Sequence, residues 1–292
     1  MKAITKTYNG IMLQEKCIPV VENKSVLIKV TLAGLCRTDC YAARDKIAVQ
    51  SGITLGHEFT GTIEKSGQDV EGFKLNQRVC VMPVMVKNND YYMLGVDLDG
   101  AYADYVTVPA SHVYPIPDHL GIEEAAFMEP VAACLAVVNM PIAPTQRGLI
   151  YGNNRIAELT RRILYLKGFN AIDVFDDYQM SQQANEYDFI IETTPTAEAF
   201  ENMVRLVKPK GLIVLKSRPS TFIPLPAHTI VKKEIRLMGA YYGDFKESIA
   251  LLATGGLDVR DLFGSTYSFD EAIPILLGQQ YISEDKKIFF KP

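Results

Sequence analysis

The chain has 292 residues, of which 48% are hydrophobic and 22% charged, a globular composition that excludes disordered, collagen-like and disulfide-rich classes. Its 30 Lys and Arg against 34 Asp and Glu give a net charge of −4, so nucleic acid and anionic membrane are not expected as main partners. Five cysteines indicate a reducing compartment, and the N-terminus MKAITKTYNG lacks the apolar core of a signal peptide, so a cytoplasmic protein is expected.

Residues 1–115 are expected to be rich in β-strands. Their short runs rich in Val, Ile and Thr are bounded by Gly, Asn or Pro, and lie at 26–34, 61–67, 78–83 and 103–109. The spacing of these runs predicts a barrel-like or sandwich unit. The apolar stretch 125–144 carries Glu129 and three prolines, so no membrane-spanning segment is expected.

Residues from about 148 to 264 alternate between strand and helix patterns. The expected strands are 148–151, 172–175, 188–193 and 211–216, and the expected helices are 156–169 and 197–207. Short connections between alternating strands and helices predict an α/β fold with a parallel sheet. A helix near 270–279 and a strand at 286–290 follow.

These two patterns predict two domains. We expect the first to comprise residues 1–140 and 265–292, and the second to comprise residues 141–264. The prolines and polar residues of 141–147 are expected to join them.

Four residues of the first half carry side chains that bind metals: Cys36, His57, Glu58 and Glu129. A thiolate, an imidazole and two carboxylates suit Zn²⁺, which accepts sulfur, nitrogen and oxygen ligands in a four-coordinate site. A site with three protein ligands and one exchangeable position is catalytic rather than structural. Taken singly, each residue also has a structural explanation, since a lone cysteine is commonly a small buried apolar residue.

Four segments together resemble the zinc-dependent medium-chain dehydrogenases, the superfamily of alcohol, polyol and threonine dehydrogenases: GLCRTDC (34–40), GHEFTG (56–61), DGAYADYVTVP (99–109) and MEPVAACLAV (128–137). The resemblance covers nearly the whole chain. It implies a β-rich GroES-like catalytic domain and a Rossmann-type parallel-sheet nucleotide domain. It also implies Cys36, His57 and Glu58 as zinc ligands, with Glu129 reaching zinc directly or through water.

The same resemblance implies a mechanism in which Cys36, His57, Thr38 and Asp39 are catalytic residues. Zinc would stabilise the alkoxide of an alcohol while hydride leaves the carbinol carbon for a nicotinamide ring. Thr38 matches the hydroxyl of the family's proton relay, and Asp39 matches the carboxylate that orients the ligating histidine, here His57. Thr38 and Asp39 are equally compatible with an ordinary helix N-terminus.

The segment 148–164 predicts a strand, a turn and a helix, an arrangement that places a pyrophosphate over the helix N-terminus. Gly152 takes the first position of a G-x-G-x-x-G pattern, Asn154 the second, and Ala157 the third, where alanine is tolerated. Asn154 departs from the pattern, but asparagine can adopt a positive φ, so the turn can still form. Arg155 is expected to add positive charge near the pyrophosphate.

Asp176 lies 24 residues beyond Gly152, near the spacing of the acidic residue that bonds the ribose hydroxyls in dinucleotide folds. A carboxylate there repels a 2′-phosphate, so NAD is expected rather than NADP; an aspartate without function is the alternative. ETTP (192–195) resembles the family's turn over the cofactor, which adds Thr194 to the expected cofactor residues.

Two segments depart from the family. No cysteine lies between Pro83 and Gly100, where relatives carry four, so one catalytic zinc and no structural zinc is expected. The interval between Asp177 and Asp188 is shorter than a parallel crossover needs, which predicts a sheet with a reduced number of strands. Three further cysteines are expected to pack in apolar surroundings: Cys17, Cys80 and Cys134.

The leading hypothesis is a zinc- and NAD-dependent dehydrogenase acting on the secondary alcohol of a polyol, cyclitol, amino-sugar or amino-alcohol. Two alternatives stay open: a carbonyl reductase of a biosynthetic pathway, and a degenerate relative that binds a ligand without turnover. The altered glycine motif and the trimmed sheet motivate the last. A homodimer is a further expectation, because exposed sheet edges often pair between subunits.

Overall fold

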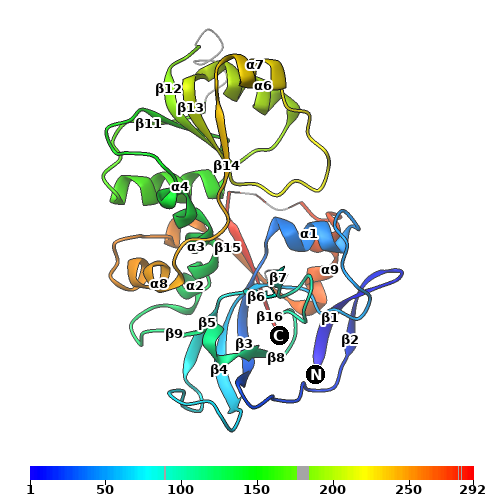
Figure 1. Cartoon of the computed structure of the whole chain (residues 1–292). Coiled ribbons are helices and arrows are strands. Elements are labelled where there is room, and N and C mark those ends of the chain that lie inside the picture. Colours follow the sequence, from blue (N-terminus) through cyan, green and yellow to red (C-terminus); the bar gives the residue numbers. More distant parts are fainter. Residues whose placement is uncertain (89, 176–183, 282, 284) are drawn as a thin grey trace. The chain divides into compact units, whose positions relative to one another are not determined.

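The computed structural model describes residues 1–88, 90–175, 184–281, 283 and 285–292 (Figure 1). Within these residues the chain separates into two compact units, Met1–Glu129 with Ile249–Pro292, and Pro130–Ser248. The chain passes from one unit to the other within α3 (Met128–Leu135) and returns within α8 (Phe245–Ala253).

A seven-stranded sheet organises the first unit. Its strands run in the order β15 (Phe263–Ser268), β16 (Lys287–Lys291), β3 (Ser25–Gly34), β4 (Glu58–Ser66), β5 (Arg78–Val81) and β9 (Val113–Pro115), with β8 (Tyr105–Pro109) also pairing with β3. All of these pairs are antiparallel except β15 with β16. The expected β-rich first domain is confirmed.

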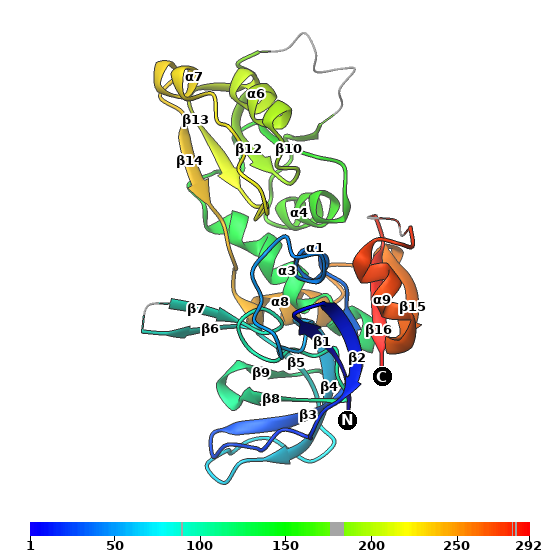
Figure 2. The same ribbon diagram turned by 90° about the vertical axis from the view of Figure 1, so that its right-hand side faces the viewer.

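The other elements of the first unit surround this sheet. They are the strands β1 (Lys2–Thr7), β2 (Gly10–Glu15), β6 (Val84–Lys87) and β7 (Asp90–Met93), the helices α1 (Arg37–Ala43), α2 (Ile122–Ala125) and α9 (Phe269–Leu277), and the short 3₁₀ turns Ala110–His112 and Arg260–Leu262. Strands β6 and β7 form a hairpin that extends from the unit (Figure 2). This hairpin lies in the interval between Pro83 and Gly100, which contains no cysteine.

Strand β3 is buried along its length except at two positions near its middle. Lys29 and Thr31 are exposed while the residues between and beside them are buried, the alternation of a sheet with one face in water. From Leu32 to Gly34 every residue is buried. Among the polar residues that follow this end of β3, Arg37 is exposed, Cys36 and Thr38 are half-buried, and Asp39 is buried in the interior of the unit.

The second unit is built on a five-stranded parallel sheet. Its strand order is β11 (Ile172–Val174), β10 (Gly148–Tyr151), β12 (Tyr187–Glu192), β13 (Val207–Leu215) and β14 (Arg236–Gly239). The helices are α4 (Arg155–Leu166), α6 (Ala197–Leu206) and α7 (Ala227–Lys232), with a 3₁₀ turn at Ala136–Asn139. The described strands number one fewer than the six of a full doubly wound fold, as expected from the short interval before Asp188.

Alternate residues of the second sheet pack on helices of opposite faces. Ile150 and Phe189 lie in a cluster with Ala157 and Leu164 of α4. Their chain neighbours Leu149 and Ile190 lie in a cluster with three residues of α6, Phe200, Met203 and Val204. Helices on both faces bury the central strands β10 and β12 almost completely, which explains why their sequences form continuous apolar runs.

Within the described ranges, no helix is long and apolar enough to cross a membrane.

Candidate active site

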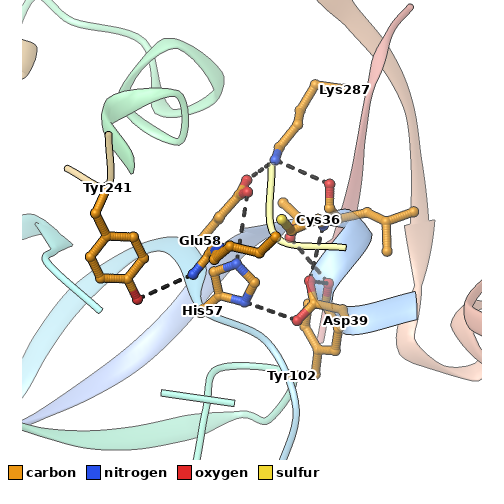
Figure 3. A network of polar contacts seen from close by, with 10 residues as sticks. Cys36, Asp39, His57, Glu58, Tyr102, Tyr241 and Lys287 are labelled. Carbon is orange, nitrogen blue, oxygen red and sulfur yellow. Dashed lines mark hydrogen bonds and ion pairs between the residues drawn. The ribbon is translucent and has the colours of Figure 1, made fainter. Parts of the chain in front are cut away.

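A buried cluster of metal-binding side chains lies where β3 ends and β4 begins (Figure 3). Cys36 offers a thiol sulfur, His57 a ring nitrogen and Glu58 a carboxylate oxygen, and these three atoms lie within 4.8 Å of one another. His57 is 0% and Glu58 3% exposed. The structure thus brings together three of the four residues that the sequence predicts as metal ligands.

The pairing register of β3 and β4 brings Cys36 next to His57 and Glu58. Gly34 pairs with Glu58 across the antiparallel ladder, so Cys36 emerges beside His57 two residues later. Cys36 is the N-cap residue of α1, with φ −109° and ψ 155°. Its backbone N–H donates to Asp39 Oδ2 at 2.9 Å, which fixes the first turn of the helix next to the cluster.

Asp39 joins the helix turn to the histidine. Its Oδ1 lies 3.0 Å from His57 Nδ1, and its Oδ2 accepts a hydrogen bond from the Tyr102 hydroxyl at 2.8 Å. The Tyr102 ring packs edge-on against Phe290, with centroids 5.2 Å apart, which holds the hydroxyl in place. Asp39 therefore fixes the orientation of His57, and is itself held by Cys36 and Tyr102.

The electrostatics of the cluster favour charged groups, although Asp39 and His57 are fully buried and Cys36 is half-buried. Burial disfavours the charge on Asp39, but the adjacent His57 outweighs it and lowers the pKa of Asp39. Burial likewise opposes charge on His57, yet Asp39 and Cys36 raise its pKa well above the usual value. Burial disfavours the Cys36 thiolate, but His57 favours it, and the balance lowers the pKa of Cys36 to about 7.

The donor set fits a zinc ion on two observations. Asp39 engages Nδ1 of His57, so the other ring nitrogen, Nε2, faces Cys36 and Glu58, and Nε2 has no hydrogen-bond partner among the described residues. Buried polar atoms in folded proteins are nearly always paired. An imidazole nitrogen without a hydrogen-bond partner, beside a thiol of low pKa, therefore suits the role of a metal ligand. Sulfur, nitrogen and carboxylate oxygen are ligands that zinc accepts.

A buried lysine that the sequence analysis missed completes the cluster. Lys287 is 0% exposed, its ammonium forms an ion pair with the Glu58 carboxylate, and it donates to the Leu35 carbonyl at 3.1 Å. Burial lowers the pKa of Lys287 to about 8. Nothing in the run KKIFF distinguishes this lysine from an exposed one, because its burial depends on strand pairing distant in sequence.

The two remaining residues predicted for this site lie near the cluster. Glu129, in the first turn of α3, is buried, and its negative charge raises the pKa of Cys36, but its carboxylate is outside the group of three donor atoms. Thr38 is half-buried in the first turn of α1, two residues after Cys36.

In the second unit, Gly152, Asn154 and Thr194 meet where β10 leads into α4. Gly152 has φ +131°, and a Cβ there would lie 2.3 Å from Thr193 Oγ1 and 2.5 Å from Thr194 Oγ1. Only glycine fits this close approach without strain. Asn154 Nδ2 donates to Thr193 Oγ1 at 3.2 Å and to Thr194 Oγ1 at 3.5 Å.

The turn forms with Asn154 at the second position, but without the positive φ that asparagine permits. Asn154 has φ −150° and is the N-cap of α4, where its Oδ1 accepts from the backbone N–H of Ile156 at 3.0 Å and of Ala157 at 3.1 Å. The positive φ occurs at Gly152 alone in this turn, since asparagine is a strong N-cap residue and here fulfils that role. Arg155 is the first residue of α4. Asp176 lies outside the described residues.

The expectation for the other cysteines is partly corrected. Cys80 and Cys134 are buried, as expected, whereas Cys17 is exposed. Cys17 follows β2, which ends at Glu15, so it lies in a connecting segment rather than in a strand with a buried face.

Comparisons with known proteins agree with the fold. The alcohol dehydrogenase GroES-like domain family matches residues 22–118. D-xylulose reductase A of Aspergillus oryzae is 22% identical over 316 residues, which cover 90% of this chain and 88% of that protein. L-threonine 3-dehydrogenase of Xanthomonas oryzae pv. oryzae is 32% identical over 149 residues, 44% of each chain.

A solved structure described as a zinc-binding dehydrogenase from Sinorhizobium meliloti 1021, bound to NADP, has the same fold. It matches with a TM-score of 0.90 at 22% identity and covers 100% of this chain and 99% of that chain. The fold and the site define an oxidoreductase of the alcohol and polyol dehydrogenase type. Residues 22–118 form an alcohol dehydrogenase GroES-like domain, and the chain as a whole is similar to medium-chain dehydrogenases, with no cysteine between Pro83 and Gly100.

Proposed function

We propose that this protein is a zinc- and NAD-dependent dehydrogenase that transfers hydride between a secondary alcohol and the nicotinamide ring. The observation that carries the proposal is the set of half-buried Cys36 and buried His57 and Glu58, in which His57 Nε2 lies 4.0 Å from Glu58 Oε1 and has no hydrogen-bond partner within the described chain. A thiol whose pKa is about 7 is partly ionised at neutral pH, as a zinc ligand requires.

We assign the roles of the first unit's residues as follows. Cys36, His57 and Glu58 hold the zinc ion, which when bound stabilises negative charge on the alcohol oxygen. Asp39 holds the His57 ring through Nδ1, so that Nε2 stays directed at the other two ligands. The Thr38 hydroxyl, which can both donate and accept, carries the alcohol proton away. Glu129 adds negative charge beside the ligands rather than among them.

The nicotinamide cofactor, which accepts the hydride, is assigned to the turn between β10 and α4. Gly152 permits the close backbone approach that a pyrophosphate needs. The amides of Ile156 and Ala157 are bonded to Asn154 Oδ1, so the pyrophosphate and this side chain compete for the same donors. NAD is proposed over NADP because the carboxylate of Asp176 would repel a 2′-phosphate. Since the similar structure from Sinorhizobium meliloti is bound to NADP, a binding test should include both nucleotides.

The proposed substrate is the secondary alcohol of a polyol, cyclitol, amino-sugar or amino-alcohol. The resemblance to a D-xylulose reductase and to an L-threonine 3-dehydrogenase supports this class. The same site would serve a carbonyl reductase working toward the alcohol. A relative that binds its ligand without turnover is the second candidate, which the Asn154 cap on the helix amides favours.

Zinc content and nucleotide binding test the proposal together. The purified protein is expected to hold one zinc per chain, to enhance NADH fluorescence on binding, and to reduce NAD with at least one member of a polyol and amino-alcohol panel. Cys36→Ser is expected to lose zinc and activity while its circular dichroism stays unchanged. Wild-type protein that binds neither zinc nor nucleotide contradicts the proposal; binding of both without turnover supports the non-catalytic candidate.

A further inference from the structure

Lysine is almost never fully buried unless its ammonium is paired, so the partners of the buried Lys287 explain its position. Here its contacts are the Glu58 carboxylate and the Leu35 carbonyl (Figure 3). Strand pairing puts it there: Phe289 of β16 pairs with Gly34 of β3, so Lys287, two residues earlier, extends alongside the residues that follow Gly34.

The interior leaves room for this lysine only because residue 34 is glycine. A Cβ on Gly34 would lie 2.4 Å from Lys287 Cε, and 3.0 Å from both Lys287 Nζ and Glu58 Oε2. Contacts of 2.4 Å do not occur between such atoms, so any side chain at position 34 would displace the lysine stem. The GLC segment thus provides space for Lys287 as well as the ligand Cys36.

The charged groups of the cluster form a chain of ion pairs. Asp39 lies 3.0 Å from His57, His57 Nε2 lies 4.0 Å from Glu58 Oε1, and the other oxygen of Glu58 lies against Lys287, its nearer cation. A buried carboxylate without a counter-charge is strongly destabilising, so Lys287 stabilises Glu58 when no metal is present. A dication held by Glu58 would be repelled by the same ammonium, because both lie at one carboxylate in a poorly screened interior.

We propose that Lys287 is a positioning residue that acts as the internal counter-ion of Glu58 and shares this carboxylate with the zinc ion. The inference rests on the proposed zinc site. Its consequence is that Lys287 keeps the empty site folded and at the same time limits the affinity of the loaded site.

The test compares Lys287→Met with Lys6→Met. Lys6 is 3% exposed in the same unit and forms an ion pair with Asp45 at 2.7 Å, so its replacement also removes a buried ammonium from a carboxylate, but away from the zinc site. For each variant the melting temperature is measured in metal-stripped and zinc-loaded protein, and the zinc Kd is measured by competition with a chromophoric chelator. The visible spectrum of the Co²⁺-substituted protein reports the ligand sphere.

We expect Lys287→Met to bind zinc about tenfold more tightly than wild type, within the range that neighbours of metal ligands produce. Its metal-stripped form should melt lower, its zinc-induced rise in melting temperature should exceed that of wild type, and its Co²⁺ bands should shift. Lys6→Met should lower both melting temperatures equally and leave the zinc Kd and the Co²⁺ bands unchanged. Lys287→Arg, which keeps the charge, should restore the wild-type Kd.

Unchanged or weaker zinc binding by folded Lys287→Met would overturn the inference, since Lys287 would then only fill space or orient the ligand. If the metal-stripped variant does not fold, release of zinc from the loaded variant into excess chelator decides: slower release than wild type supports the inference, and equal or faster release overturns it. Wild-type protein without zinc affinity overturns this inference and the proposed function together.

Discussion

Asp39 Oδ1 lies 3.0 Å from His57 Nδ1, and this contact leaves the opposite ring nitrogen directed at Cys36 and Glu58. The carboxylate has a second task, since its other oxygen accepts the Cys36 amide. One side chain therefore couples the start of α1 to the orientation of the histidine.

Replacing this carboxylate by an amide tests the coupling. Asp39→Asn retains an oxygen for the Cys36 amide but removes the negative charge that orients His57. Zinc affinity is expected to fall by about 10- to 100-fold, measured by chelator competition. Tyr102→Phe, which removes only one hydrogen bond to Asp39, serves as control and should have a smaller effect. Equal zinc affinity in Asp39→Asn and wild type would argue against an orienting role for Asp39.

Asn154 is expected to weaken nucleotide binding. Asn154→Gly frees the amides of Ile156 and Ala157 for a pyrophosphate, and two hydrogen bonds of about 1 kcal/mol each predict NADH binding tighter by roughly thirtyfold. A glycine at an N-cap costs only a few tenths of a kcal/mol, so the fold should persist.

Thr196 provides the matched control for this change. It caps α6 in the same unit through a bond to the Ala199 amide at 3.0 Å. Thr196→Gly should change stability to a similar extent and leave the NADH Kd, measured by fluorescence titration, unaltered. Weaker NADH binding by Asn154→Gly would show that the asparagine assists the cofactor rather than competing with it.

Position 56 requires glycine for two reasons, its backbone conformation and the side chain packed against it. Its φ is +92°, and a Cβ would lie 2.4 Å from Tyr102 Cδ1, beneath the ring whose hydroxyl bonds Asp39. Gly56→Ala is expected to lower the free energy of unfolding by about 2–4 kcal/mol, measured with urea, from positive φ and overpacking together. Gly72→Ala separates the two causes, because Gly72 has φ +84° and no atom within 4 Å of its Cβ position. A loss near 1–2 kcal/mol is expected there.

Thiol reactivity should distinguish the cysteines by pH. In metal-stripped protein, alkylation of Cys36 should rise as pH increases through about 7, because the thiolate is the nucleophile and predominates above its pKa. Burial raises the pKa of Cys80, which should stay unlabelled until the protein unfolds. Exposed Cys17 is the accessibility control. Peptide mass spectrometry measures each site, and added zinc should protect Cys36. Labelling of Cys36 that ignores both pH and zinc would contradict the prediction.

Local sequence patterns were sufficient to predict most strands and helices of the second unit. The strand expected at 148–151 coincides with β10, and the helix expected at 156–169 is α4, which ends at Leu166. The early end has a local cause, since Gly168 adopts φ +85°, a conformation that terminates helices. The N-cap role of Asn154 was also accessible from sequence, because asparagine is among the strongest N-cap residues.

The sequence by itself indicated Cys36, His57 and Glu58 as candidate metal ligands, because their side chains suit zinc and their short motifs resemble those of a known family. Only the tertiary structure decided which charges face one another. Lys287 meets a carbonyl 252 positions away and the carboxylate of Glu58, through the pairing of β16 with β3 and of β3 with β4. Helix caps and strand periodicity act over a few residues, whereas a buried ion pair depends on the register of strands that no local pattern encodes.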